Sequence, residues 1–186
     1  MSKYLISDLH LGHKRILEFS GEYRDGDTVE EHNEILLDKI NRTVNPTDHL
    51  WILGDCVMGG KQNLPLLGRI NCENKKLVMG NHDSSWNVRD FLPYFVDIKG
   101  VVNEKEFLLS HIPVTNDNDL RYSRMNIHGH THSPEFFNWE TKRNINVGVE
   151  AVNGWPIDIQ DIRKFLKLET YFEAEDFILN HKTRAR

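Results

Sequence analysis

The sequence predicts an α/β protein, built as a layered β-sheet sandwich flanked by helices, with both parallel and antiparallel strands. Two observations lead to this prediction. Short apolar runs recur along the chain, each closed by polar and glycine residues. Helical patterns separate the early runs, whereas the later runs follow one another more directly. Strands that alternate with helices favour a layered sheet protein, and the later part favours an antiparallel portion.

Six apolar runs are the expected strands. They read "YLISD", "HLWILGD", "KKLVMGN", "KEFLLSH", "MNIHGH" and "INVGVE", at residues 4–8, 49–55, 75–81, 105–111, 125–130 and 145–150. Several are apolar at successive positions rather than at alternate ones, which is typical of strands buried on both faces. We therefore expect most of them inside the sheets.

The clearest expected helix covers residues 28–44, "TVEEHNEILLDKINRTV". Thr28 followed three residues later by Glu31 is a capping box. The apolar stripe includes Leu36 and Ile40, with Asn33 in the same face, and we place His32 on the polar side, in solvent. Further helices are expected within 88–95, which Pro93 interrupts, and within 158–168 and 174–181.

Composition restricts the class of protein. No linker or repeat divides the 186 residues, so we expect one domain over residues 1–186. The net charge of −5 argues against a stable nucleic-acid partner or a membrane-surface binder, since both need a basic surface. No apolar run has the length of a membrane span, and the first residues do not have the pattern of a signal peptide. Cys56 and Cys72 lack metal-ligand spacing, so we expect free thiols and a cytoplasmic protein.

Polar residues collect where the expected strands end. In chain order they are Asp8, His10, Asp55, Asn81, His82, Asp83, His111, His128, His130 and His132. Open α/β sheets place ligand sites beyond the carboxyl ends of their strands, so the fold would gather these residues along one edge. Carboxylates, imidazoles and an amide without a thiolate suit divalent metals such as Mn, Fe, Ni or Zn, and the set is large enough for two ions. A glycine precedes Asp55, Asn81 and His130, which permits a sharp exit from a strand and a close approach of the backbone.

Taken in order, these motifs resemble the calcineurin-like metallophosphoesterase family. The motifs are D-x-H at Asp8 to His10, G-D at Gly54 to Asp55, G-N-H-D at Gly80 to Asp83, a lone His111, and G-H-x-H at Gly129 to His132. The opening "SDLHLGHKRILEF" and the later "VGVEAVNGWPI" also resemble a compact bacterial and phage branch of that family. That branch usually carries Asp where this chain has Glu150, so we assign Glu150 no role.

The resemblance implies two metal ions that share Asp55. Asp8, His10, Asp55 and His132 would hold the first ion, and Asp55, Asn81, His111 and His130 the second. Manganese is the favoured metal, with Fe, Ni and Zn as alternatives. A hydroxide that bridges the ions would attack phosphorus. His82 would face the substrate and either stabilise the phosphoryl oxygens or protonate the leaving group, with Asp83 orienting it.

Weaker candidates surround this set. His13, Arg15, Arg121 and Arg124 are expected substrate contacts, the last two because they lie in the long polar segment Pro113 to Met125. A packing role for His13 is an equal alternative. His128 is expected to support a ligand from behind. We assign no function to His32, His49 and His181.

The sequence therefore predicts a metal-dependent phosphoesterase that hydrolyses a small phosphate ester such as a nucleotide, with a phosphodiester favoured over a phosphomonoester. Two alternatives stay open. One is a nuclease of the same superfamily, and the other is a metal-bearing scaffold that binds a protein without turnover. The oligomeric state is not predicted.

Overall fold

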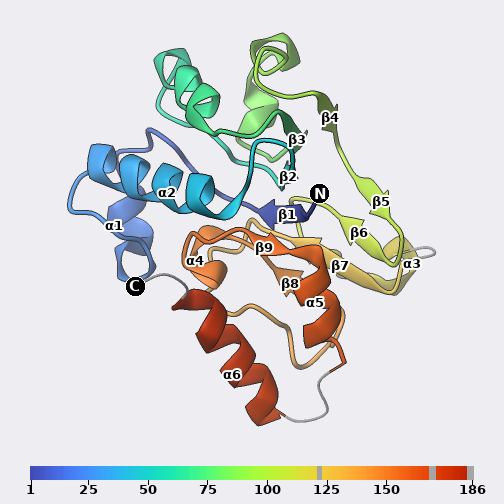
Figure 1. Cartoon of the computed structure of the whole chain (residues 1–186). Helices are drawn as coiled ribbons and strands as arrows, with labels where there is room; N and C mark the ends of the chain where they lie inside the picture. The colour runs from blue at the N-terminus through green and yellow to red at the C-terminus, as the bar shows by residue number, and fades with distance from the viewer. Residues whose placement is uncertain (121–122, 168–170, 184–186) are drawn as a thin grey trace.

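The computed structural model describes residues 1–120, 123–167 and 171–183, which form two β-sheets with helices on their outer sides (Figure 1). One sheet has the strand order β4-β3-β2-β1-β9, and the other has the order β5-β6-β7-β8. The strands are β1 Lys3–Ile6, β2 His49–Ile52, β3 Asn74–Val78, β4 Asp97–Lys99, β5 Val102–Glu104, β6 Phe107–Leu109, β7 Met125–His128, β8 Asn144–Asn146 and β9 Ile157–Asp158.

Strand pairing is mixed, as expected, but the antiparallel portion does not lie among the later apolar runs: those runs form β6, β7 and β8, which pair in parallel. Strands β1 to β4 are parallel, and β9 runs antiparallel to β1. In the second sheet β6, β7 and β8 are parallel, and β5 is antiparallel to β6. The six expected strands are confirmed as β1, β2, β3, β6, β7 and β8. The sequence did not indicate β4, β5 and β9, because each is short and contains a single apolar residue, so none forms an apolar run.

The helices are α1 Ile16–Ser20, α2 Val29–Thr43, α3 Asp117–Leu120, α4 Val149–Val152, α5 Ile159–Phe165 and α6 Tyr171–Lys182. Short 3-10 helices are η1 Gly21–Tyr23, η2 Lys61–Arg69, η3 Asp83–Ser85 and η4 Val88–Asp90. Helix α2 begins as expected, since the Thr28 side chain accepts a hydrogen bond from the Glu31 amide at 3.2 Å. The Glu31 carboxylate, however, accepts from the Asp27 amide, one residue before the expected partner. The helix expected within 88–95 is only the short turn η4, because Pro93 prevents a longer one.

The two sheets share one core and meet at their carboxyl ends. Leu5, Ile52, Leu109 and Ile127 come from both sheets and are fully buried in a single apolar cluster. Just beyond β1, the Ser7 amide donates a hydrogen bond to the Val147 carbonyl at 2.8 Å. The Ser7 carbonyl accepts a hydrogen bond from the Val149 amide at 3.1 Å. This bridge brings the end of β1 beside the end of β8. The carboxyl ends of strands from both sheets therefore lie at one common edge.

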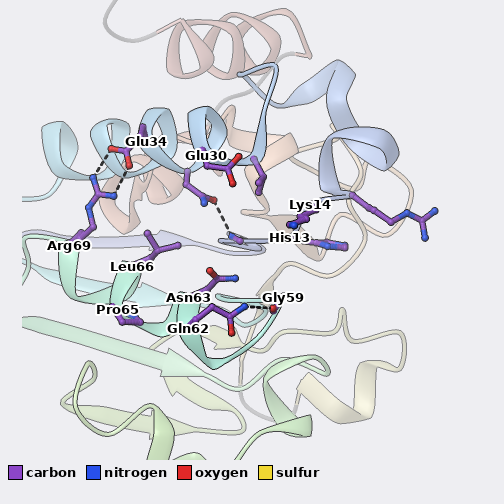
Figure 2. A pocket seen from close by; sticks show the side chains of 14 residues that line it. His13, Lys14, Glu30, Glu34, Gly59, Gln62, Asn63, Pro65, Leu66 and Arg69 are labelled. Atoms are coloured by element: carbon purple, nitrogen blue, oxygen red, sulfur yellow. Dashed lines mark hydrogen bonds and ion pairs between the residues drawn. The ribbon is translucent and has the colours of Figure 1, made fainter.

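A cavity of about 720 Å³ lies between α2 and η2 (Figure 2), and we call it the α2–η2 cavity. Its walls come from the loop after β1, from the first turns of α2 and from η2. Within the described parts of the chain, no helix is both long and apolar enough to cross a membrane.

Candidate metal centre

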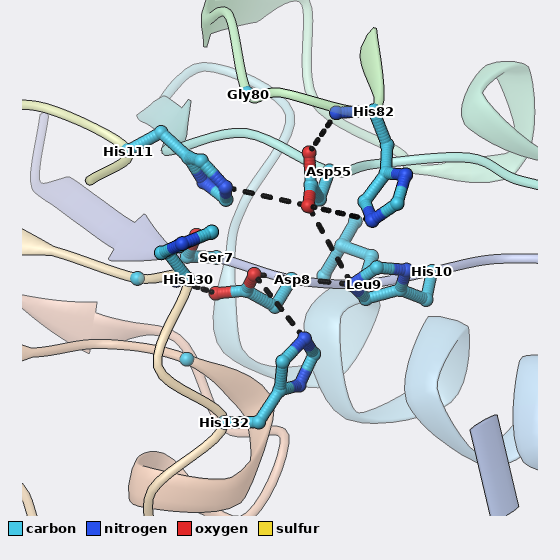
Figure 3. A network of polar contacts seen from close by, with 12 residues as sticks. Ser7, Asp8, Leu9, His10, Asp55, Gly80, His82, His111, His130 and His132 are labelled. Carbon is cyan, nitrogen blue, oxygen red and sulfur yellow. Dashed lines mark hydrogen bonds and ion pairs between the residues drawn. The ribbon is translucent and has the colours of Figure 1, made fainter. Parts of the chain in front are cut away.

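Six strand-end side chains converge at the common edge of the two sheets (Figure 3), and Asn81 adds a seventh. Two groups each bring one potential ligand atom per residue within 4.8 Å of the others. The amide oxygen of Asn81 lies 2.9 Å from Nε2 of His111 and so joins the second group. The groups are Asp8, His10 and His132, and Asp55, His111 and His130.

Asp55 lies between the two groups. Its Oδ2 is 3.3 Å from Nε2 of His111 in one group and 3.8 Å from Nε2 of His10 in the other. On the far side, Oδ1 of Asp8 is 3.9 Å from Nε2 of His10 and 4.0 Å from Nε2 of His132. This position fits the shared ligand that the sequence motifs imply.

The backbone at the ligands is unusual. Among the residues that the structure describes, eight non-glycine residues have positive φ, and five of them are candidate ligands. A side chain in the left-handed region costs about 1–2 kcal/mol per residue, so the conformation persists only where the surroundings enforce it. Such strain is concentrated at functional sites. The five are Asp8, His10, Asp55, His130 and His132, with φ of 59°, 48°, 52°, 71° and 49°.

Two glycines permit the convergence through close approach. A Cβ at Gly80 would lie 2.2 Å from Oδ1 of Asp55. A Cβ at Gly129 would lie 2.0 Å from Oγ of Ser7 and 2.2 Å from Oδ2 of Asp8. Both contacts are far shorter than van der Waals distance. The glycines in the G-N and G-H motifs therefore leave the space that the carboxylates occupy.

We predict that Gly80→Ala displaces the Asp55 carboxylate and lowers the affinity for Mn²⁺ at least tenfold. Gly100→Ala is the matched control, because a Cβ there meets nothing within 4 Å. Isothermal titration of both variants with Mn²⁺, and the rise in Tm that Mn²⁺ causes, measure the effect. Equal affinities for the two variants would contradict the role of this glycine.

Hydrogen bonds from behind fix how three imidazoles face the centre. Nδ1 of His111 lies 2.8 Å from the Leu53 carbonyl oxygen, and Nδ1 of His132 lies 2.8 Å from Oε1 of Glu150. Nδ1 of His10 lies 3.0 Å from Sδ of Met58. A hydrogen bond at Nδ1 leaves Nε2 as the metal-facing atom and fixes the ring. The three rings are therefore oriented before any ion binds.

Glu150 belongs to a buried network that sequence reasoning missed. Its Oε1 accepts a hydrogen bond from Nε of Arg24 at 2.8 Å and lies 2.8 Å from Nη2 of the same guanidinium in an ion pair. Arg24 also donates to the carbonyl oxygens of Asp8, at 2.7 Å, and Leu9, at 3.3 Å. The pair thus ties the His132 ring to the backbone of the first ligand loop.

The same network corrects the placement of His32. This residue is buried rather than solvated, with its Nε2 3.2 Å from Arg24 and its Nδ1 3.0 Å from the Asp25 carbonyl oxygen. Burial, and next the charge of Arg24, lower the pKa of His32 to about 4, so the ring is neutral at pH 7.

We predict that Glu150→Gln lowers the Mn²⁺ affinity about tenfold, because the loss of the carboxylate weakens the His132 ligand while the side chain keeps its size. The exposed Glu135 provides the control Glu135→Gln. Titration calorimetry with Mn²⁺ checks the affinity. An affinity equal to that of the control would show that Glu150 has only a packing role.

The protonation states suit cation binding. Burial, opposed mainly by His111 and His132, raises the pKa of Asp8 to about 6. Burial, together with the charge of Arg24, holds the pKa of His10 well below its usual range, so this ring is neutral, the form that could bind a metal ion. Asp8 Oδ1 and His10 Nε2 are buried and have no hydrogen-bond partner within the described residues. Buried polar atoms without partners are costly, and a divalent cation between these atoms would satisfy both.

We predict that the Mn²⁺ affinity falls about tenfold for each pH unit below about 6, because the metal must displace a proton from Asp8. The pKa of His111 and that of His132 are raised by hydrogen bonds to Asp55 and Glu150 despite burial, so protons on these rings add to the loss. Titrations at pH 5, 6, 7 and 8 measure the slope. An affinity that stays constant from pH 7 to pH 5 would contradict the prediction.

Asp83 does not have the role expected for it. Its carboxylate accepts hydrogen bonds from the amides of Asp55 at 2.7 Å, Gly80 at 2.9 Å and Cys56 at 3.1 Å. It therefore joins the turns after β2 and β3 instead of orienting the His82 ring. The His82 amide donates to Oδ1 of Asp55 at 2.9 Å, and its side chain, 46% exposed, lies at the mouth of the site.

Of the weaker candidate residues, some lie near the candidate metal centre and others do not. His13 lines the α2–η2 cavity, with its ring centroid 5.7 Å from that of His10. Arg15 also lines the cavity but pairs with Glu18 at 3.0 Å. His128 is buried, and its Nδ1 contacts the Gly129 carbonyl oxygen rather than a ligand side chain.

Arg124 precedes β7, at the end of that strand opposite to the ligands, so the expected substrate contact does not fit its position. Arg121 lies outside the described residues.

Comparison with known proteins agrees with this geometry. Residues 1–155 match the calcineurin-like phosphoesterase superfamily domain. The chain belongs to this superfamily. Among its relatives is the Gene 66 protein of Mycobacterium phage L5, 32% identical in an alignment that covers 80% of this chain and 86% of the phage protein. Another is protein MJ1445 of Methanocaldococcus jannaschii, 29% identical, with 88% of this chain and 90% of the relative covered.

Among solved structures, this calcineurin-like phosphoesterase is similar to protein AQ665 from Aquifex aeolicus. The TM-score is 0.68 at 26% identity, with 88% of this chain and 98% of the other covered. The phage relatives are consistent with the compact branch to which the sequence motifs point.

Proposed function

We propose that this calcineurin-like phosphoesterase hydrolyses a small phosphate ester, a diester in preference to a monoester, with two divalent metal ions. The observation that carries the proposal is the pair of candidate ligand groups, because Asp55 of one group also faces His10 of the other. A separation of ~3.5–4 Å between two ions suits displacement at phosphorus. Two groups that share one carboxylate support such a pair.

The donor atoms fit divalent cations of borderline softness. Asp8, His10, Asp55 and His132 would hold one ion, and Asp55, Asn81, His111 and His130 the other. When bound, such a pair supplies Lewis acidity toward phosphoryl oxygens and lowers the pKa of water toward ~7. Manganese is the favoured metal within this proposal.

His82 is the side chain best placed to act on the substrate. Its Nε2 is 3.9 Å from Oδ2 of Asp55, and nearly half of the side chain is open to solvent. The backbone hydrogen bond to Asp55 holds the residue beside the ligands without using the ring. The imidazole is therefore available to donate a proton to a leaving oxygen or a hydrogen bond to a phosphoryl oxygen.

An assay with metal-stripped protein tests the proposal. The protein is incubated with Mn²⁺, Ni²⁺, Zn²⁺ or Mg²⁺, and bis-p-nitrophenyl phosphate is compared with p-nitrophenyl phosphate and with a DNA or RNA oligonucleotide. We expect the diester to be hydrolysed fastest. No turnover with any metal would overturn the proposal in favour of a scaffold, and comparable rates on the oligonucleotide would favour a nuclease.

We predict that His82→Ala lowers kcat by ~10²–10⁴ on a diester with an alkyl leaving group, because general acid catalysis has about this magnitude. Metal content, measured by elemental analysis, stays unchanged since His82 is not among the proposed ligands. His82→Gln separates the two roles: glutamine still donates a hydrogen bond but cannot protonate the leaving oxygen. Full activity of His82→Ala would exclude both roles.

A further inference from the structure

The α2–η2 cavity begins beside the candidate metal centre. His13 lines it, and the His13 ring is the neighbour of His10, with 5.7 Å between the centroids. Asn63, also in the lining, donates to the Met58 carbonyl oxygen at 2.8 Å, and Met58 contacts His10 through sulfur. A phosphate ester held at the ligands can therefore extend its organic group past His13 into the cavity.

The walls of the cavity combine apolar surface with hydrogen-bond acceptors (Figure 2). Helix α2 contributes Val29 and Glu30 to one wall, and η2 contributes Pro65 and Leu66 to the facing wall. Two such walls suit a flat group between them. At about 720 Å³, the volume lies within the range of ~300–1,000 Å³ typical of small-molecule sites.

The charges in the cavity disfavour a second anionic group. Both arginines of the lining already have acidic partners: Arg69 is held by the two oxygens of Glu34, at 2.6 and 2.5 Å, and Arg15 pairs with Glu18 at 3.0 Å. The Glu30 carboxylate makes no hydrogen bond or ion pair within the described residues, which leaves it available to accept from a ligand. Lys14 lies at the His13 end, on the side of the candidate metal centre, where it suits a phosphate.

We propose that the α2–η2 cavity binds the uncharged organic group of the ester, and that this group is a nucleoside. A nucleobase supplies a flat ring and N–H donors, and a ribose supplies hydroxyl donors for the carboxylate and amide oxygens. The assignment of this group as part of a substrate rests on the proposed phosphoesterase activity. Binding of a free nucleoside in the cavity does not depend on that activity.

Binding of free nucleosides to the metal-free chain tests the cavity directly. Adenosine, guanosine, cytidine and uridine are titrated by ligand-observed NMR, with myo-inositol as a polyol that lacks a flat ring. We expect at least one nucleoside to bind with a Kd in the millimolar range or tighter. Binding of none of the four, or tighter binding of myo-inositol, would overturn the proposal.

Two variants test whether the nucleoside binds in the α2–η2 cavity. Leu66→Trp fills the cavity and should weaken nucleoside binding at least tenfold, whereas Leu179→Trp, at an exposed leucine of α6, should leave it unchanged. Glu30→Gln should weaken binding about fivefold or more, because a hydrogen bond to a charged acceptor becomes one to a neutral amide oxygen. Unchanged binding in both cavity variants, with circular dichroism showing that they fold, would overturn the proposal.

A second measurement uses the metal-loaded protein. Thymidine 5′-p-nitrophenyl phosphate and methyl p-nitrophenyl phosphate release the same phenol, so only the retained group differs. We expect Leu66→Trp to raise KM at least tenfold for the nucleoside ester and less than twofold for the methyl ester. An equal change for both esters would contradict a nucleoside site.

The two proposals fail separately. Nucleoside binding without hydrolysis of any ester would leave the cavity assignment standing and overturn the phosphoesterase proposal. Hydrolysis of bis-p-nitrophenyl phosphate without nucleoside binding would do the reverse.

Discussion

Two buried carboxylates, Asp8 and Asp55, are the constraint on which the rest of the site depends. Both are shielded from water, and each accepts a backbone hydrogen bond from another ligand loop: Asp8 from the His130 amide at 2.8 Å and Asp55 from the His82 amide at 2.9 Å. Burial of a carboxylate without a counter-charge is costly, and burial raises the pKa of Asp8 for this reason. Divalent cations remove that cost. The loops are therefore arranged around two buried carboxylates where divalent cations could bind.

The strained backbone follows from the same constraint. Parallel strands end side by side and point in the same direction. The backbone after each strand must therefore turn sharply if its side chain is to point back toward the centre. The left-handed conformations at the ligands achieve these turns. Hydrogen bonds between the loops offset their cost: the Asp8 amide donates to Gly54 at 3.0 Å, and the His10 amide donates to the Asp55 carbonyl at 2.9 Å. The loops hold one another in a geometry that none would adopt alone.

Sequence reasoning identified residues that the fold does bring together, because they belong to strand ends, and strand ends are visible as apolar runs that stop at polar residues. It missed Arg24 and Glu150, which are 126 positions apart and meet only through the fold. A signal was nevertheless present, since Glu150 is a lone carboxylate in an apolar run. The burial of His32 could also have been predicted, since it lies three residues after Val29 and four before Leu36, on the buried stripe of α2. The role of Asp83 could not be predicted, because its partners are backbone amides, which every residue except proline has.

The distribution of charge connects the two ends of the proposed site. Arg24 neutralises Glu150 within the protein, so Asp8 and Asp55 remain as the carboxylates that face the centre. Two divalent ions there would leave a net positive charge inside a chain whose overall charge is −5. Such a centre attracts a phosphate locally, whatever the overall charge. At the other end, the free carboxylate of Glu30 repels a second anion and accepts hydrogen bonds from neutral donors. A molecule that carries one phosphate and one uncharged, donor-rich group satisfies both ends at once, whereas a polyanion satisfies only the first.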